Sequence, residues 1–164
     1  MGRDDEFSLF FASRFDRARR TAHALCGDWG EAEEIAQTAF VRMYAHWSKV
    51  RHESAEAYLR TVVTRVFLDS RRRGRKREQA VASPPESAVE ADHSSDERQP
   101  LLAALQHVPP RQRAVLVLRY AHDLSVEQVA EALRCSTGTV KSQTARGLQT
   151  LREAYRGAAT PETA

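Results

Sequence analysis

Apolar side chains recur every three or four positions along most of this 164-residue chain, and they nowhere follow the two-residue alternation of a strand. The pattern predicts an all-α fold made of two small helical domains, residues 1–78 and residues 100–156. Within the first domain it predicts three helices, at about 6–26, at about 31–47, and from Ala55 into an arginine-rich run.

Each of these three helices has an apolar stripe and a defined start or end. Residues 27–30 separate the first two helices, and Ser54 is placed to cap the third. Glu31, Glu33 and Glu34 in the first turn of the second helix suit the helix dipole. The side chains predicted to face the core are Phe7, Phe10, Phe11, Ala18, Ala22 and Leu25, then Ile35, Ala39, Phe40, Met43 and Tyr44, then Tyr58, Leu59, Val62, Val66 and Phe67.

The second domain begins with two short helices, opened by Pro100 and Pro110, because proline suits the first helical turn. Residues 124–156 then have the pattern of a helix-turn-helix. Ser125 and Gln128 form a capping-box pair before its first helix. The tight turn is predicted at residues 134–136, where the Ser136 side chain can cap the second helix.

The last helix has two contrasting sides. The side predicted to face the core contains Val140, Thr144, Leu148, Leu151 and Tyr155. The opposite side contains Thr139, Lys141, Ser142, Ala145, Arg146 and Gln149. Hydroxyl, amide and cationic groups on one helix face suit the DNA major groove. The alternative interpretation is an ordinary amphipathic helix whose polar face is solvated.

Between the two domains, residues 79–99 are rich in Pro, Ser, Ala and acidic residues, which predicts a flexible acidic linker. A surface loop within one domain is the alternative, although it would be unusually long. The tail, residues 157–164, is predicted to be disordered. The formal net charge is +3, and the linker, with five acidic residues against one arginine, separates two basic blocks.

The strongest concentration of charge is at residues 71–77, where six of seven positions are Arg or Lys. Such a run can bind nucleic-acid phosphates with salt-sensitive, sequence-independent affinity. It can also be a solvated helix end, since cations are favourable at a helix C-terminus.

Several other classes of protein find little support in the sequence. Cys26 and Cys135 are too few for a disulfide framework, and His23 with Cys26 lacks the second ligand pair of a metal site, so we expect neither metal nor cofactor. No signal peptide and no long apolar segment is evident, which favours a cytoplasmic protein without membrane insertion. The sequence contains no glycine-rich phosphate loop, nucleophile elbow or deaminase motif, so we do not expect an enzyme.

The two predicted domains and the linker, in this order, resemble bacterial RNA polymerase sigma factors of the extracytoplasmic-function (ECF) group. Members of this group keep sigma regions 2 and 4, joined by a linker. The stretch EAEEIAQTAFVRMYAHW is similar to the helix of region 2 that docks on polymerase, and AYLRTVVTRVFLDSRRR to the promoter-melting helix. LQHVPPRQRAVLVLRYAHDLSVEQVAEALRCSTGTVKSQTARGLQTLR follows the −35-binding pattern of region 4. The resemblance covers about residues 7–78 and 100–156.

The resemblance implies that the chain is a promoter-specificity subunit that binds core RNA polymerase, at its β′ clamp helices and β flap, and promoter DNA. Residues expected to meet polymerase are Glu33, Glu34, Gln37, Phe40 and Met43. Those expected at the −10 element are Lys49, Arg51, His52, Arg60, Arg65, Arg71, Arg72 and Arg73, with the rest of the run to Arg77 on phosphates. Those expected at the −35 element are Ser136, Thr139, Lys141, Ser142 and Arg146.

Two positions depart from the family pattern. Many members have Asn where Arg65 stands and Arg where Gln143 stands, which leaves the promoter sequence open. Many members are held by an anti-sigma protein, but these residues identify no such partner. The alternative function is a stand-alone regulator that binds duplex operator DNA through its helix-turn-helix and dimerises through the first domain.

Overall fold

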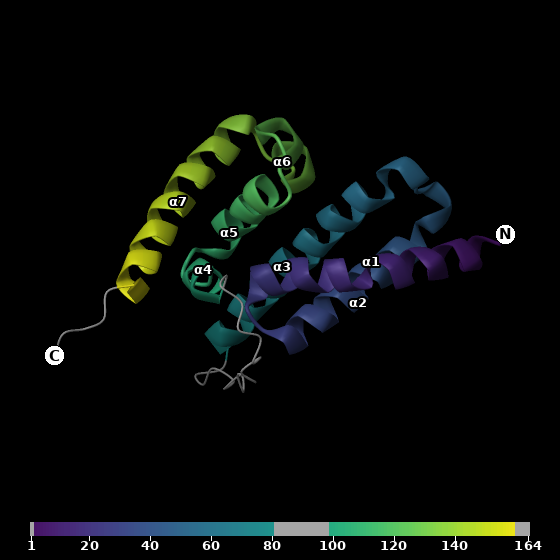
Figure 1. Cartoon of the computed structure of the whole chain (residues 1–164), viewed down its shortest axis with the longest axis horizontal. Helices are drawn as coiled ribbons and strands as arrows, with labels where there is room; N and C mark the ends of the chain where they lie inside the picture. Colours follow the sequence, from purple (N-terminus) through teal and green to yellow (C-terminus); the bar gives the residue numbers. More distant parts are fainter. Residues whose placement is uncertain (1, 81–98, 160–164) are drawn as a thin grey trace. The chain divides into compact units, whose positions relative to one another are not determined.

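The computed structural model describes residues 2–80 and 99–159, and every element named below lies within those ranges (Figure 1). The chain forms two compact units, residues 1–90 and residues 91–164, which we describe separately. All regular elements in the described ranges are helical, which confirms the all-α class. No helix there is both long and apolar enough to cross a membrane.

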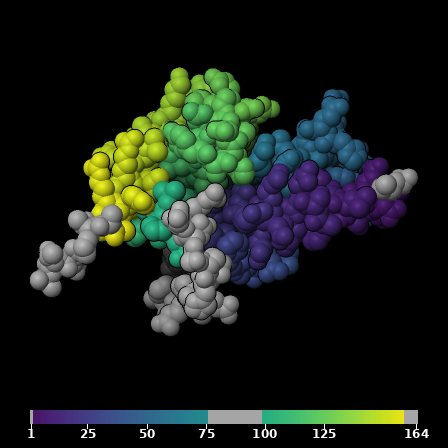
Figure 2. Space-filling view, in the orientation of Figure 1, coloured from purple at the N-terminus to yellow at the C-terminus, as the bar shows by residue number. Residues whose placement is uncertain are grey.

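Unit 1 is a three-helix arrangement of α1 (Arg3–Cys26), α2 (Trp29–Ala45) and α3 (Ala55–Ala80). Two 3-10 turns, η1 (Trp47–Lys49) and η2 (His52–Ser54), connect α2 to α3. Each of the three helices packs on the other two, and α1 keeps one side on the surface (Figure 2). The core of the unit therefore lies between all three helices.

The break between α1 and α2 is shorter than predicted. Gly27 adopts a left-handed conformation, with φ of 79°, and its N–H donates to the His23 carbonyl oxygen over 2.8 Å. Glycine has no Cβ penalty in this conformation, so it ends the helix. The Asp28 side chain then accepts from the Gly30 N–H over 3.0 Å and caps α2, which consequently begins at Trp29.

Most side chains predicted to face the core of unit 1 are buried. The buried members are Ala18, Ala22, Leu25, Ile35, Ala39, Phe40, Met43, Leu59, Val62, Val66 and Phe67. Phe7, Phe10 and Tyr58 are half-buried. The helical period of the apolar positions therefore identified the packed faces of all three helices.

Three predictions in unit 1 are wrong in detail. Phe11 is 38% exposed, although its ring contacts Phe40 at a centroid distance of 4.9 Å and Phe15 at 5.0 Å. Tyr44 is 43% exposed, because its hydroxyl reaches out to donate to Asp4 Oδ1 over 2.8 Å. Ser54 donates its hydroxyl to the carbonyl oxygen of residue 51 within η2, which leads directly into α3, so the predicted cap is replaced by a 3-10 turn.

Unit 2 contains α4 (Gln99–Leu105), α5 (Pro110–Leu116), the π-helical turn η3 (Val117–Ala121), α6 (Val126–Leu133) and α7 (Thr137–Ala159). The long helix α7 packs against α4, α5 and α6, and is therefore the centre of the unit (Figure 1).

A buried arginine that the sequence analysis missed holds the corner between α4 and α5. Arg113 is only 5% exposed, and its Nε donates to the carbonyl oxygens of Leu105 (3.1 Å) and Val108 (3.2 Å). Its Nη2 donates to the carbonyl oxygens of Gln106 (3.0 Å) and Val108 (2.9 Å). Leu105 is the last residue of α4, and Gln106 and Val108 lie in the turn that follows it, so one side chain of α5 caps the end of α4 and holds the turn after it.

Helices extend slightly into the segments predicted to be irregular. α3 continues to Ala80, α4 already includes Gln99, and α7 continues to Ala159. The extensions are therefore two residues at the end of α3, one at the start of α4 and three at the end of α7. The rest of the predicted linker and tail, residues 81–98 and 160–164, lies outside the described residues.

Candidate functional site

The exposed face of α2 combines acidic, amide and apolar side chains. Glu33, Glu34 and Gln37, three of the residues predicted to meet polymerase, are all exposed. Val41, one turn beyond Gln37, is 70% exposed, the highest value among the large hydrophobic side chains of the described residues. Gln37 lies three and four residues after Glu34 and Glu33, and Val41 lies four residues after Gln37, so the four residues share one side of the helix.

Phe40 and Met43, the other two residues predicted to meet polymerase, do not lie on this face. Phe40 is 2% exposed and Met43 is 0% exposed, and both belong to the core between the helices of unit 1. A residue buried against its own domain cannot contact a partner without unfolding that domain. Val41 was not among the residues predicted from the sequence to meet polymerase, although its i,i+4 spacing from Gln37 places it on the same helix side.

The turns between α2 and α3 present three of the residues predicted to bind the −10 element. Lys49, Arg51 and His52 are exposed, while Trp47 is buried at 5% and anchors the turns to the core. His52 contacts the Trp47 ring edge-on at a centroid distance of 6.3 Å, and its Nε2 lies 3.6 Å from Glu6 Oε2. These three side chains are thus grouped on a short segment that Trp47 anchors to the core of unit 1.

Arg60 and Arg65 lie on α3 but on different sides of it. Both are half-buried, and a separation of five residues turns them roughly 140° apart around the helix axis. Arg60 Nε is buried and has no hydrogen-bond partner among the described atoms. The structure therefore does not bring these two side chains together on one surface.

The beginning of the arginine-rich run is only partly available to a ligand. Arg71 is half-buried and ion-paired with Glu31 of α2, and Arg72 is exposed and paired with Asp69. Arg73 is exposed. The carboxylate of Glu31, which the sequence analysis interpreted only as complementing the helix dipole, is therefore also a partner of the run.

In unit 2 the structure contains the predicted helix-turn-helix. The Ser125 Oγ accepts from the Gln128 N–H over 3.1 Å, and the Gln128 side chain accepts from the Ser125 N–H over 2.8 Å. Both bonds of the predicted capping box are thus present at the start of α6. Arg134 ends α6 in the left-handed region, with φ of 55°, and Ser136 Oγ accepts from the Thr139 N–H over 3.0 Å.

The two sides of α7 differ as the sequence predicts. Val140 is fully buried, Thr144 donates to the Val140 carbonyl oxygen, and Leu148 and Leu151 are half-buried. On the other side Thr139 is half-buried, and the exposed members are Lys141, Ser142, Ala145, Arg146 and Gln149. Exposed Ser136 lies just before this face, at the N-terminus of the helix. All five residues predicted to bind the −35 element therefore lie at or near one surface.

One residue of the predicted apolar stripe does not reach the core. Tyr155, in the last turns of α7, is 46% exposed. Gln143, the position that departs from the family pattern, is half-buried between the two sides of α7.

The cysteine and histidine of α1 have local packing partners. Burial raises the pKa of the Cys26 thiol to about 12, and its Sγ donates to the Asp28 carbonyl oxygen over 3.2 Å. The His23 ring stacks on Trp29 at a centroid distance of 3.8 Å, and the Arg19 guanidinium lies over the same indole. In the described part of the chain no three His, Cys, Asp or Glu residues are grouped as metal ligands.

Comparison with known proteins agrees with these two units. The family model of Sigma-70 region 2 matches residues 10–77, and that of Sigma-70 region 4 matches residues 98–151. The RNA polymerase sigma-E factor of Streptomyces coelicolor is 36% identical over 155 residues, which cover 93% of this chain and 88% of that protein. The ECF RNA polymerase sigma factor SigL of Mycobacterium tuberculosis is 30% identical over 141 residues, covering 81% and 79%.

Among solved structures, the sigma factor RpoE from Bartonella quintana, crystallised in complex with the anti-sigma factor NepR, is similar with a TM-score of 0.73. It is 26% identical, and the match covers 92% of this chain and 97% of that chain. The chain belongs to the RNA polymerase sigma factors, and within them to the ECF group. It is therefore a promoter-recognising sigma subunit, and a stand-alone regulator is not favoured.

Proposed function

We propose that unit 1 docks the chain on core RNA polymerase and opens the −10 element, while unit 2 binds the −35 element as duplex. The proposal rests mainly on the two sides of α7. This helix is capped by Ser136, packs one side against the other helices of unit 2, and exposes Lys141, Ser142 and Arg146 on the opposite side. This is the geometry with which a recognition helix enters a major groove.

Docking on polymerase is proposed for the exposed face of α2. Val41 would be its apolar centre, with Glu33, Glu34 and Gln37 around it, because a few central anchors dominate most interfaces. The acidic groups suit a basic partner surface, such as the β′ clamp helices that the family resemblance implies. Contact between unit 2 and the β flap is part of the same proposal.

Opening of the −10 element is proposed for η1, η2 and α3. Lys49, Arg51 and His52 are exposed on a segment anchored by Trp47, so they can hold an unpaired strand. Capture of extruded bases offsets part of the unpairing cost and shifts the duplex toward the open state. Arg60 and Arg65 would contribute from two different sides of α3.

At the −35 element the proposal assigns two kinds of contact. The Ser136-capped N-terminus of α7 would lie near a phosphate, where the helix dipole favours negative charge. Thr139, Lys141, Ser142 and Arg146 would contact base edges or flanking phosphates. Gln143 is at the margin of this surface and can supply an amide to an adenine edge.

The proposal includes no catalytic activity of the chain itself and no cofactor, since a sigma subunit directs an enzyme rather than acting as one. It places the protein in the cytoplasm, with core polymerase and DNA. Control by an anti-sigma protein, as in the solved complex of the Bartonella relative, remains a prediction for this chain.

The test is run-off transcription with core polymerase on a pool of genomic promoter fragments, with and without the protein. We expect new, defined start sites that share −35 and −10 sequences and that disappear when both Lys141 and Arg146 are replaced by Ala. Arg152→Ala, which removes an exposed cation further along α7, is the matched control and should keep the start sites. Tight binding of the protein alone to duplex DNA, without any new start site, would instead support the stand-alone regulator.

A further inference from the structure

The arginine-rich run at the end of α3 contains residues in two different states. Arg71 is held by unit 1 itself, since its Nη1 lies 2.5 Å from Glu31 Oε1 and its Nη2 lies 3.4 Å from Glu31 Oε2. Its guanidinium also lies 5.0 Å from the centre of the Phe67 ring. The side chains of Arg71 and Glu31 are only 31% and 27% exposed, so this two-point pair is partly shielded from water.

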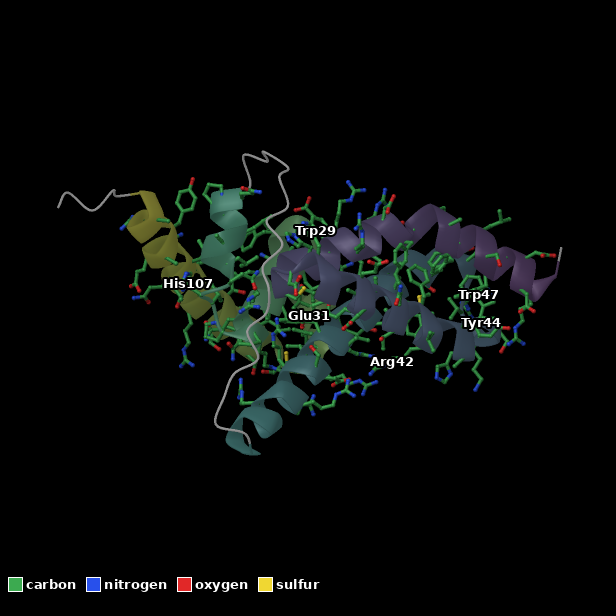
Figure 3. All side chains as sticks on the ribbon, turned by 90° about the horizontal axis from the view of Figure 1, so that it is seen from below. Trp29, Glu31, Arg42, Tyr44, Trp47 and His107 are labelled. Carbon is green, nitrogen blue, oxygen red and sulfur yellow. The ribbon has the colours of Figure 1, made fainter. Side chains whose placement is uncertain are left out.

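A second link joins α2 to α3 two residues earlier along α3. Asp69 accepts from Arg42 of α2 through Oδ2 and from Arg72 through Oδ1, each over 3.2 Å. Residues 69 and 71 are turned roughly 200° apart around a helix, so the two links leave α3 on opposite sides. Glu31 and Arg42, both labelled in Figure 3, come from the first and last turns of α2. Together the links fix α3 across α2.

The next two arginines after Arg72, unlike Arg71, are not held by the described part of unit 1. Arg73 and Arg75 are exposed, and neither has an ion pair or hydrogen bond with any other described residue. Both oxygens of Asp69, one turn before Arg73, are already occupied. A phosphate can therefore bind Arg73 or Arg75 without breaking an existing contact, whereas binding Arg71 would leave the partly buried Glu31 carboxylate unpaired.

From this division we infer that Arg73 and Arg75 bind the promoter phosphates, and that Arg71 is a positioning residue that fixes the end of α3 on α2. This inference rests on the proposed function, because it assigns residues within the proposed DNA contact of unit 1. It also changes the expectation from the sequence, in which Arg71 was itself a DNA contact. Arg72 is 72% exposed, and its pair with Asp69 is weak enough to be exchanged.

The number of phosphates that the protein neutralises can be counted from the salt dependence of binding. We would form holoenzyme with Arg73→Gln, Arg75→Gln and Arg71→Gln chains and titrate it with a promoter fragment across a range of salt concentrations. Each lost phosphate contact lowers the slope of log K against log salt by about 0.7 on single strands or about 0.9 on duplex. We expect this reduction for Arg73→Gln and for Arg75→Gln, and an unchanged slope for Arg71→Gln. Arg20→Gln, at an exposed cation of α1, is the control for loss of charge alone.

Thermal unfolding of the free chain tests the positioning role. Arg71→Gln and Glu31→Gln should each lower the unfolding midpoint of unit 1, whereas Arg73→Gln and Arg75→Gln should not. Exchange of the two charges, Glu31→Arg with Arg71→Glu, should recover most of the loss and keep the wild-type slope. A reduced slope for Arg71→Gln, or unchanged slopes for both Arg73→Gln and Arg75→Gln, would overturn the inference. If wild-type holoenzyme showed no promoter-dependent binding at all, the proposed function would fail instead.

Discussion

Gly147 of α7 lies directly against Leu116 of α5, where these two helices pack. A β-carbon at Gly147 would lie 3.1 Å from Leu116 Cδ1, 3.2 Å from Leu116 Cγ and 3.3 Å from Gln112 Cβ. Two of these atoms are close to the α5 backbone, so rotation of a side-chain tip cannot relieve the contact. The position of the recognition helix therefore depends on a residue without a side chain.

We accordingly expect Gly147→Ala to destabilise unit 2, although alanine favours a helix by about 1 kcal/mol over glycine. Overpacking of a well-filled core costs about 1–3 kcal/mol, and Leu116 and Gln112 would have to shift to admit the new β-carbon. Denaturant unfolding of the chain would measure the difference. Gly157→Ala, where nothing lies within 4 Å of the new β-carbon in the same helix, should be neutral or slightly stabilising. Equal effects at both positions would contradict the close approach.

Ser136 caps α7, and we propose that it also lies near a −35 phosphate, two roles that substitutions at this position can separate. Ser136→Asp should keep the cap of α7, since Asp caps helices about as well as Ser, and should change stability by less than about 0.5 kcal/mol. Its negative charge should nevertheless weaken holoenzyme binding to a −35 element by about tenfold, which corresponds to about 1.4 kcal/mol. Ser136→Ala should instead lower stability by about 1 kcal/mol. Unfolding and promoter titration of the same two variants would show whether the roles separate.

The proposed polymerase-binding face of α2, with Val41 at its centre, also makes a specific prediction. Val41→Ala should weaken binding to core polymerase by about tenfold if it truncates a central anchor, with little change in stability. Met43→Ala should cost about 2–5 kcal/mol of unfolding free energy, because it opens a cavity in the core. Leu9→Ala, at another exposed apolar residue, is the control and should leave core binding unchanged. If Met43→Ala reduced core affinity without loss of stability, Met43 would be a contact residue after all.

The two cysteines should differ sharply toward a thiol reagent at pH 8. Cys26 is buried, and its pKa is raised to about 12, so very little thiolate is present. Cys135 is half-exposed and should be labelled in the native protein, while Cys26 should be labelled only after unfolding. Because the folded pKa of Cys26 lies above its ordinary value of 9.0, its contribution to stability is complete below pH 9 and is lost as pH rises toward 12. Mass spectrometry of labelled peptides would distinguish the two sites.

The sequence predicted the helices well because their signals are local. The apolar period located the buried faces, and the Ser125–Gln128 and Ser136 caps located both helices of the helix-turn-helix to within a residue. The exposed set on α7 followed directly from the same period. These features depend on residues within a few positions of one another, which a single sequence contains.

The features that sequence missed depend on contacts between distant positions. Nothing local distinguishes Arg71 from Arg73, since only the approach of Glu31, forty residues earlier, decides which is paired. Phe40 and Met43 are apolar, which is compatible with either a core or an interface. Only the packing of the three helices shows that they are buried in the core of unit 1. Arg113 resembles any other arginine of its segment in sequence. It is buried because it donates to backbone carbonyl groups at the end of α4 and in the turn between α4 and α5.

The contact between Arg113 and the end of α4 also has a consequence for the order in which unit 2 forms during synthesis. α4 has seven residues, which is too short to be stable as an isolated helix. The guanidinium that caps it belongs to residue 113, so α4 must leave the ribosome before its own cap exists. The first helix of the unit can therefore dock only after the second has been made, and a pause in translation between them would leave α4 unfolded.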